Sequence, residues 1–573
     1  MRRRPFVTIA AALLVLTLAT AGWALWRASQ VRSELTGVQR LVHTVQSDVR
    51  KGRIDHARSV LATVQARLDR ADSRVHGPIW AAAQYLPVLG RNLHGVARAA
   101  EAGKLLGDGA LPGLLDAFDT VRLHHPLKNS TVDLAQLAQI AQDVRQATTA
   151  AARAKAVLAP SDEPLLASVR ANLKQVRRTV ADLEGRLQSV TQALDVARTM
   201  LGADGARTYL LVLQNNAEAR ATGGLIGAFA VVRVDHGTIS LARTGSDAEF
   251  RQSDVPVVRL PGAAATWQAI GSTRAWYDAN LTPHFPDAAA SVAGLWRAQG
   301  GTQVDGVLGV DPVAMRELLA GARPIPLPTG APVTADNIVD FVGHREYVDY
   351  PDYVRRKALL GDLTGQMFHQ VLAAKDPVGT LKAALRAGQS GHLLMWSRHP
   401  AEQALLAGGP LGGALPADDT PYLSVLTQNF GGNKLDYYLQ RAVTVTRARP
   451  GVLRVRVVLT NTAPLGLPLY MTVRSDKPKP PVPYGQAKVG FAVYAGRDSV
   501  FTEATVDGRP VVLEQDSDHG HALGTTSLEL PRDAPVTIDL LVSERAGLLT
   551  YRQQPLLFPD RLRIVPPHRV VGR

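Results

Sequence analysis

Residues 215–224, NNAEARATGG, place two amides, a carboxylate, a guanidinium and a glycine pair between two apolar runs. Glycine pairs allow backbone N–H groups to converge on an anion, and a guanidinium such as that of Arg220 binds phosphate through two parallel hydrogen bonds. The apolar runs at 209–213 and 225–232 predict buried strands on both sides. The segment is therefore either a polar turn or an anion-binding site, and the direction of Arg220 decides between them.

Further basic residues follow in two later segments. Arg243 and Asp247 lie after the next predicted strand, and more arginines lie before and inside a long predicted helix at 355–372. We expect these basic elements to meet over one polyanionic group; the alternative is that each arginine is an exposed or salt-bridged surface residue. The candidate catalytic residues are Arg220, Asp247 and Arg355. The candidate ligand-binding residues are Asn215, Asn216, Glu218, Gly223, Gly224, Arg243, Arg345, Arg356 and Lys357.

Other common site motifs do not occur. The sequence has no Walker loop, GxGxxG, GxSxG or HExxH pattern, and it has no cysteine, which excludes disulfides, thiol nucleophiles and zinc–cysteine sites. Residues 516–521, DSDHGH, contain metal-ligand residue types, but we predict a solvated turn there and assign no metal ligands. The formal net charge of +14 comes mainly from dispersed arginines, so we expect no nucleic acid partner.

The N-terminus predicts a membrane anchor. Residues 6–26 are uncharged and, as a helix, would span about 30 Å, the thickness of a bilayer core. With the arginines at positions 2–4 kept inside, the chain would be a single-pass cell-membrane protein whose bulk lies outside the cytoplasm. A cleavable signal peptide is the alternative, because Ala19-Thr20-Ala21 fits a cleavage site.

The rest of the chain predicts three domains after an anchor at 1–30. Residues 31–203 have apolar positions three and four apart, which predicts a helical bundle or coiled-coil stalk. Residues 204–400 alternate strand and helix patterns, which indicates an α/β domain. Within it, residues 235–237 (Asp-His-Gly) predict a hairpin turn, and Asp311-Pro312 predicts the start of a helix. Residues 420–566 carry short strands between Pro, Gly and Asp turns, which predicts an immunoglobulin-like β-sandwich.

Four fragments carry a family resemblance: LLVLQNNAEARATGGLIGAFAVV, VDGVLGVDPVAMRELL, LPVLGRNL and NFGGNKLDYYLQRAV. They resemble a widespread family of membrane-anchored proteins of actinobacteria and other bacteria that is catalogued as a domain of unknown function. The resemblance covers most of the chain after the anchor. It implies a location at the cell envelope and no particular reaction.

A fainter similarity relates the order of elements to the LytR-CpsA-Psr cell-wall ligases. A strand pair at 224–241, a loop at 243–247, a strand at 304–310 and arginines at 345–357 follow one another in the same order, although the loop and arginine motifs differ in their letters. In those ligases the arginines hold the pyrophosphate of a polyprenyl-linked glycan, with Mg²⁺ nearby.

The similarity implies an extracytoplasmic envelope protein that binds a lipid-linked pyrophosphate glycan. Whether it also transfers the glycan, as a LytR-CpsA-Psr-type phosphotransferase with or without Mg²⁺, is left open by the sequence. The alternative is a non-catalytic envelope scaffold or glycan-binding protein. The partners expected are the membrane, a cell-wall glycopolymer or polyprenyl-pyrophosphate lipid, and other envelope proteins.

Overall fold

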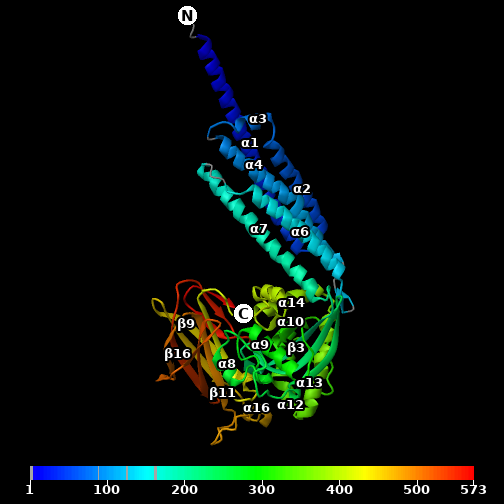
Figure 1. Cartoon of the computed structure of the whole chain (residues 1–573), viewed down its shortest axis with the longest axis vertical. Coiled ribbons are helices and arrows are strands. Elements are labelled where there is room, and N and C mark those ends of the chain that lie inside the picture. The colour runs from blue at the N-terminus through cyan, green and yellow to red at the C-terminus, as the bar shows by residue number, and fades with distance from the viewer. Residues whose placement is uncertain (1–3, 88, 124–126, 129, 161–163, 573) are drawn as a thin grey trace. The chain divides into compact units, whose positions relative to one another are not determined.

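The structure is a computed structural model that describes residues 4–87, 89–123, 127–128, 130–160 and 164–572. Within these ranges it describes all side chains except those of residues 4–16, 50, 121–123, 127–128 and 377. The chain forms two compact units (Figure 1). The first comprises residues 1–126 and 133–203, and the second comprises residues 127–132 and 204–573.

The first unit is built from long helices that pack on one another. Its helices are α1 (Arg4–Arg50), α2 (Ile54–Arg74), α3 (Pro78–Ala83), α4 (Leu89–Leu105), the π-helical turn η1 (Leu106–Ala110), α5 (Leu111–Leu123), α6 (Leu134–Val157) and α7 (Ala167–Met200). Apolar positions three and four apart form the buried face of each helix. On α7, for example, Leu173, Val180 and Leu187 recur every seven residues and are buried. The periodicity of residues 31–203 thus corresponds to helix-to-helix packing.

The predicted transmembrane helix at residues 6–26, and the single-pass membrane location based on it, are wrong. In the described part of the chain no helix is long and apolar enough to cross a membrane. The apolar run continues into the bundle as part of α1, where Ala24 and Val31 are fully buried in a cluster with Val75 and Trp80. Apolar composition alone does not distinguish a side chain that faces lipid from one that packs on a neighbouring helix. The arginines at positions 2 and 3 lie outside the described residues.

The second unit contains a mixed sheet in the order β1-β2-β5-β4-β3-β6-β7. Its strands are β1 (Leu127–Lys128), β2 (Thr131–Val132), β3 (Arg207–Arg220), β4 (Gly223–Asp235), β5 (Thr238–Ser246), β6 (Gly306–Val310) and β7 (Leu393–Ser397). β3 pairs antiparallel with β4 and parallel with β6. His236 and Gly237 both have positive φ in the turn between β4 and β5, which confirms the hairpin predicted at 235–237.

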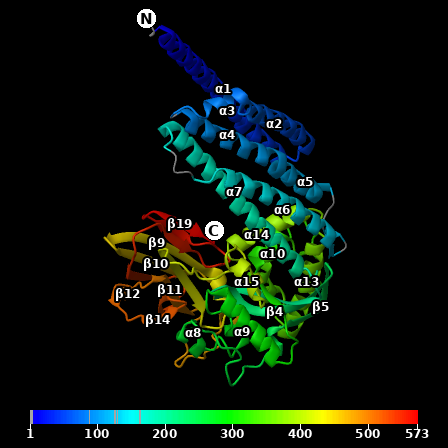
Figure 2. The same ribbon diagram turned by 45° about the horizontal axis from the view of Figure 1, so that its top comes forward.

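Helices cover both faces of this sheet (Figure 2). Its helices and helical turns are η2 (Asp247–Glu249), α8 (Ala265–Ile270), η3 (Trp276–Asp278), α9 (Phe285–Ala298), α10 (Pro312–Leu318), α11 (Ile338–Asp340), η4 (Phe341–Arg345), α12 (Glu346–Asp349), α13 (Tyr353–Leu372), α14 (Pro377–Gln389) and α15 (Pro400–Ala407). Alternate residues of β3 face opposite cores: Leu210 and Val212 pack with α9, whereas Leu211 and Leu213 pack with α10 and α13. The result is a three-layer α/β/α domain.

A β-sandwich follows the α/β domain. Its first sheet has the order β13-β12-β16-β10-β9-β18 and its second the order β14-β15-β11-β8-β17-β19. The strands are β8 (Tyr422–Asn429), β9 (Leu439–Arg449), β10 (Val452–Asn461), β11 (Ala487–Arg497), β12 (Phe501–Val506), β13 (Arg509–Pro510), β14 (Glu514–Asp518), β15 (His521–Leu530), β16 (Pro535–Ser543), β17 (Leu549–Arg552), β18 (Arg561–Ile564) and β19 (His568–Val571). Short helices η5 (Leu435–Tyr438) and α16 (Leu469–Thr472) lie in its loops.

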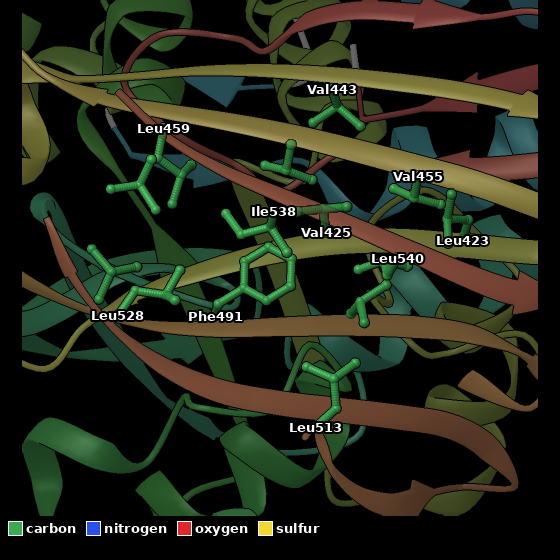
Figure 3. Close-up of a cluster of buried hydrophobic side chains, with 14 of the residues drawn as sticks. Leu423, Val425, Val443, Val455, Leu459, Phe491, Leu513, Leu528, Ile538 and Leu540 are labelled. Atoms are coloured by element: carbon green, nitrogen blue, oxygen red, sulfur yellow. The ribbon is translucent and has the colours of Figure 1, made fainter. Parts of the chain in front are cut away.

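The sandwich core lies between the two sheets. Figure 3 shows Val443, Val455 and Ile538 from one sheet turned toward Val425 and Phe491 from the other. The immunoglobulin-like topology expected for this region differs from the one found, because β17 pairs parallel with β8 and β18 pairs parallel with β9. The C-terminal strands therefore extend both sheets in parallel, an addition that turn and strand patterns do not reveal.

Candidate functional site

The segment NNAEARATGG is a β-hairpin end with a large bulge. Asn215 pairs with Leu225 and Ala219 pairs with Gly224, so that residues 216–218 are extra residues on β3. Gly224 is required at this point, because a Cβ there would lie 2.0 Å from the Asn215 carbonyl oxygen. The polar segment therefore continues the strand, and its bulged residues turn away from β4.

The bulge contacts the loop that follows β8 in the sandwich. Glu218 forms a buried ion pair with Lys434. The backbone N–H of Ala219 donates to Asp436 Oδ2 at 2.7 Å, and Arg220 Nη1 donates to the Asn429 carbonyl oxygen at 2.8 Å. Burial raises the pKa of Asp436 to about 7. Two of the fragments that carry the family resemblance, NNAEARATGG and NFGGNKLD, thus meet in space.

A cavity of about 810 Å³ opens beside this junction. One part of its wall is apolar and comes from strands β3, β4 and β6 and from helices α10, α11 and α13. These apolar lining residues are Leu213, Leu225, Val310, Pro312, Met315, Ile338, Val342, Leu360, Leu363 and Met367. The other part is polar and combines both domains of the unit. These polar lining residues are Asn215, Glu218, Arg220, Asp247, Asp278, Glu346, Tyr347, Arg356, Lys357, Asn429, Lys434, Tyr470 and Lys488.

Arg356 is the most deeply buried cation of the cavity wall. Its Nη1 donates to the Tyr350 carbonyl oxygen at 2.8 Å, and its guanidinium carbon lies 4.3 Å from the ring centre of Tyr470 and 5.1 Å from that of Tyr347. Its Nη2 has no hydrogen-bond partner among the described residues. Because an unsatisfied buried donor is costly, this nitrogen is placed to bind an acceptor that enters the cavity.

Four other cations line the cavity with carboxylate partners, one of which is Lys488 with Asp476 at 3.4 Å. Lys357 pairs with Asp247, Lys434 with Glu218, and Arg220 Nη2 lies 3.6 Å from Asp278 Oδ1. Although burial lowers the pKa of Lys357, the neighbouring Asp247 carboxylate more than offsets this, and the net change raises it. Lys357 is therefore charged when the cavity is empty.

Glu346 is a buried acid among these cations. Burial raises its pKa to about 7, although Arg356, Lys357 and Lys434 act in the opposite direction. Its Oε2 has no hydrogen-bond partner in the described part of the chain. The adjacent Tyr347 accepts a hydrogen bond from Asn215 Nδ2 at 2.6 Å, which connects this acid to the bulge. Glu346 is thus the cavity group that changes charge near neutral pH.

The structure brings together six of the residues singled out from the sequence and separates six. Those that line the cavity are Asn215, Glu218, Arg220, Asp247, Arg356 and Lys357. Those that do not are Asn216, Gly223, Gly224, Arg243, Arg345 and Arg355.

The six residues outside the cavity have other surroundings. Asn216 donates to Asp311 and to the Pro555 carbonyl, and the two glycines shape the hairpin. Arg243 pairs with Glu249, and Arg345 pairs with Asp349. Arg355 is exposed on α13. The prediction that Arg220, Arg243 and Arg355 approach one group is therefore wrong. The cations that line the cavity include Arg220, Arg356, Lys357 and Lys434.

Sequence reasoning missed Glu346, Lys434, Tyr470 and Lys488. Lys434 lies in the fragment NFGGNKLD, whose density of Asn and Gly was an available signal for a loop of defined shape. Glu346, Tyr470 and Lys488 are single polar residues in unremarkable surroundings, and their position at the cavity depends on tertiary packing.

The DSDHGH segment contains the predicted turn, at His519-Gly520 between β14 and β15, but the segment is partly buried and not fully solvated. Asp518 is fully buried and accepts hydrogen bonds from Tyr494 at 2.7 Å and Thr282 at 3.0 Å. His519 hydrogen-bonds to Asp287 at 2.8 Å and stacks on His284, with ring centres 3.9 Å apart.

These two histidines and Asp287 are close enough to suggest a metal site. However, His284 Nδ1 accepts the Leu415 N–H at 3.0 Å, so the neutral ring carries its proton on Nε2 and has no free lone pair there. Burial lowers the pKa of His284 to about 4, which keeps the ring neutral. We therefore interpret the group as a contact that joins the sandwich to α9.

The fold and cavity define an α/β/α domain that carries a cavity and is completed by a β-sandwich. Residues 204–347 match the model of the family described as "Protein of unknown function (DUF4012)", so this chain contains a DUF4012 domain. No curated protein and no solved structure matches the chain. The matched region includes the bulge, Asp247 and Glu346, whereas Arg356, Lys434 and Tyr470 lie beyond it.

Proposed function

We propose that the cavity binds a lipid-linked pyrophosphate glycan. The observation that supports this proposal is the division of one cavity into a cationic part, with the free Nη2 of buried Arg356, and an apolar part against α10 and α13. A ligand with an anionic head and a hydrocarbon tail complements both parts.

The phosphate group would lie at the cationic part. Arg356 offers a fixed donor without a carboxylate partner, and Lys357 and Lys434 are close enough to act on the same buried Glu346 carboxyl. Tyr347 and Tyr470, which stack on each other, both contact the Arg356 guanidinium and orient it before a ligand binds. Pre-oriented charge-assisted donors are suited to pyrophosphate oxygens.

The hydrocarbon part of the ligand would lie against the apolar wall. Leu363 and Met367 of α13 face Leu213 of β3 and Met315 of α10 across this core. Leucine and methionine side chains fill irregular space and adapt to a flexible chain. The glycan would remain in the polar opening, where Asn429 and Lys488 line the wall.

Transfer of the glycan is a second candidate function, and Glu346 is the observation that favours it. An acceptor hydroxyl that attacks the phosphorus atom bonded to the sugar would form a new P–O bond and break the bond to the lipid phosphate, while its proton passes to Glu346. A carboxyl with a pKa of about 7 is matched to this proton transfer.

Mg²⁺, which the similarity to cell-wall ligases implies, does not fit the donor set of the cavity. Among the described carboxylates that line it, Asp247, Glu218 and Asp278 are each engaged by a cation, and Glu346 is beside three more. Asp311 is engaged by Asn216, His392 and the first N–H groups of α10. Mg²⁺ prefers several free oxygen ligands and waters.

The binding proposal is tested with the purified full chain in detergent. Undecaprenyl pyrophosphate should bind more tightly than undecaprenol and more tightly than inorganic pyrophosphate, because only the first ligand engages both parts of the cavity. Arg356→Gln should weaken binding at least about tenfold. The matched control is Arg297→Gln, an exposed arginine of α9 outside the cavity, which should bind as the wild type does. Equal binding by Arg356→Gln and wild type would overturn the proposal.

A further inference from the structure

A group of exposed apolar side chains lies beside Tyr470, one of the residues that line the cavity. Tyr470 of α16 lines the cavity and stacks on Tyr347 of α12 with ring centres 5.8 Å apart, and it lies 6.2 Å from Tyr353 of α13. These contacts bring α12, α13 and α16 together (Figure 1). The exposed apolar residues of the three helices and their ends, which we call the rim, are Val348, Tyr353, Val354, Leu469, Tyr470 and Val473.

The rim is unusually open for apolar residues. Val354 is 73% exposed, Leu469 is 70% exposed and Val473 is 57% exposed. Single exposed apolar residues need no explanation, but a group of six on adjoining helices, one of which lines a cavity with an apolar wall, marks an interaction surface. The apolar surface runs from the outside, through Tyr470, to the cavity wall.

Cations accompany the rim. Arg355, Lys477 and Lys479 are exposed and form no ion pair among the described residues. Two of the nearby acids are paired with cations: Asp349 with Arg345, and Asp476 with Arg474 and Lys488. Asp352 caps α13 through a backbone N–H and keeps its charge. The three cations therefore outnumber the one carboxylate left without a cation, and the free charge next to the rim is positive overall.

We propose that the rim docks on a lipid surface that carries anionic headgroups. Leu469, Val354 and Val473 would enter the interfacial layer, and Arg355, Lys477 and Lys479 would contact the headgroups. This docking rests on the proposed function. With the rim on a bilayer, a lipid-linked ligand would pass from the bilayer to the apolar wall of the cavity without its tail crossing water.

The free positive charge favours an anionic lipid surface over a second copy of this chain, whose own rim would repel it. The free positive charge also distinguishes the rim from a purely apolar contact surface for another protein. A second copy and an acidic protein partner are the other occupants to be separated by experiment.

The absence of cysteine from the sequence allows a direct test. Leu469→Cys or Val473→Cys in the full chain carries a polarity-sensitive fluorophore, and Val512→Cys, at a 90% exposed valine outside the cavity, is the matched control. With vesicles of phosphatidylcholine and phosphatidylglycerol in equal parts, the rim labels should shift to shorter wavelength and the control label should not. Vesicles of phosphatidylcholine alone should give a smaller shift.

A second variant protects the test against misfolding. Lys477→Glu with Lys479→Glu changes exposed residues only, and it should weaken vesicle binding at least about tenfold while leaving undecaprenyl pyrophosphate binding in detergent unchanged. Arg356→Gln should weaken undecaprenyl pyrophosphate binding in detergent and leave vesicle binding unchanged. The two variants therefore separate failure of the docking surface from failure of the proposed function. No shift at the rim labels would overturn the inference, as would a shift equal to that of the control. A rim-dependent dimer in light scattering would assign the rim to a second copy.

Discussion

Glu218 and Lys434, 216 residues apart in sequence, form a buried ion pair that joins the β3 bulge to the loop after β8. Both side chains are almost entirely inaccessible to solvent. The pair lies at one end of the cavity wall, so the same contact that connects the two domains also places the Lys434 ammonium near Tyr347 and Tyr470. Domain packing and the composition of the site are therefore coupled.

Removal of one partner should destabilise the second unit strongly. Lys434→Met leaves the Glu218 carboxylate buried without a cation, for which we expect a loss of about 3–5 kcal/mol in the free energy of unfolding. The double variant Glu218→Gln with Lys434→Met should recover most of that loss, because no charge is then left unpaired. Urea unfolding followed by tryptophan fluorescence measures both.

An exposed pair in the sandwich provides the control. Arg456 hydrogen-bonds to Asp539 on the surface, and Arg456→Gln should cost less than about 1 kcal/mol. If Lys434→Met costs no more than Arg456→Gln, the two domains are held together by other contacts.

Local patterns were sufficient to predict much of the α/β domain. The turn at 235–237 and the helix cap at Asp311 depend on residues close in sequence, and both are found. The bulge at 216–218 was not predictable in this way, because its polar residues are satisfied by Lys434 and Asp436 from another domain. A segment that looks too polar for a strand is buried because its partners are remote.

The candidate site, like the fold, was predictable where it depends on residues close in sequence and was not predictable where it depends on tertiary packing. The cluster of basic residues at 355–357 was visible in the sequence, but the choice among them depends on helix phase: α13 turns Arg356 inward and leaves Arg355 exposed. The first turn of a helix has no preceding apolar pattern to fix that phase. The prediction of a transmembrane helix at residues 6–26 was wrong for a related reason, since Ala24 and Val31 pack on helices that composition does not reveal.

Gly224→Ala should disrupt the hairpin end. The added Cβ would lie 2.0 Å from the Asn215 carbonyl oxygen, well inside contact distance, so the bulge must move and its contacts with the sandwich must loosen. We expect a loss of at least about 2 kcal/mol in unfolding free energy. Gly227→Ala, on the same strand and with open space around its Cβ position, is the control and should stay within about 1 kcal/mol of wild type. Similar losses for both variants would contradict the steric argument.

Glu346 should make ligand affinity depend on pH. Burial raises its pKa to about 7, so the carboxyl is neutral below that pH and ionised above it. An anionic ligand next to Arg356 is repelled by the ionised form, and its affinity should therefore fall as pH rises from about 6 to about 8. Glu346→Gln should remove this part of the dependence. Measured affinities of Glu346→Gln and wild type that fall in parallel would assign the dependence to another group.

The same residue should affect stability with a defined sign. A carboxyl whose pKa is raised in the folded state binds more protons there than in the unfolded state, so wild-type stability falls between the ordinary glutamate pKa of about 4.3 and the folded value. Relative to wild type, Glu346→Gln should become progressively more stable across that window, by a difference on the order of 2 kcal/mol at its upper end. Urea midpoints at pH values on both sides of the window test this prediction.

His519 should contribute stability at low pH that is lost as pH rises. Its hydrogen bond to Asp287 raises the pKa of the ring above the ordinary histidine value. The stabilisation is therefore complete below that ordinary value, about 6.5, and is lost as pH rises through the raised folded value. His519→Gln should be less stable than wild type at pH 6 by roughly 1 kcal/mol, and the difference should shrink toward pH 9. His284→Gln should show the opposite trend: the folded pKa of His284 is lowered to about 4, so the wild-type ring costs stability below the ordinary value of about 6.5 and that cost disappears as pH rises through it, and any deficit of His284→Gln should grow and not shrink from pH 6 to pH 8. Parallel curves for wild type and His519→Gln would show that the imidazole stack, and not the charge on His519, holds the sandwich to α9.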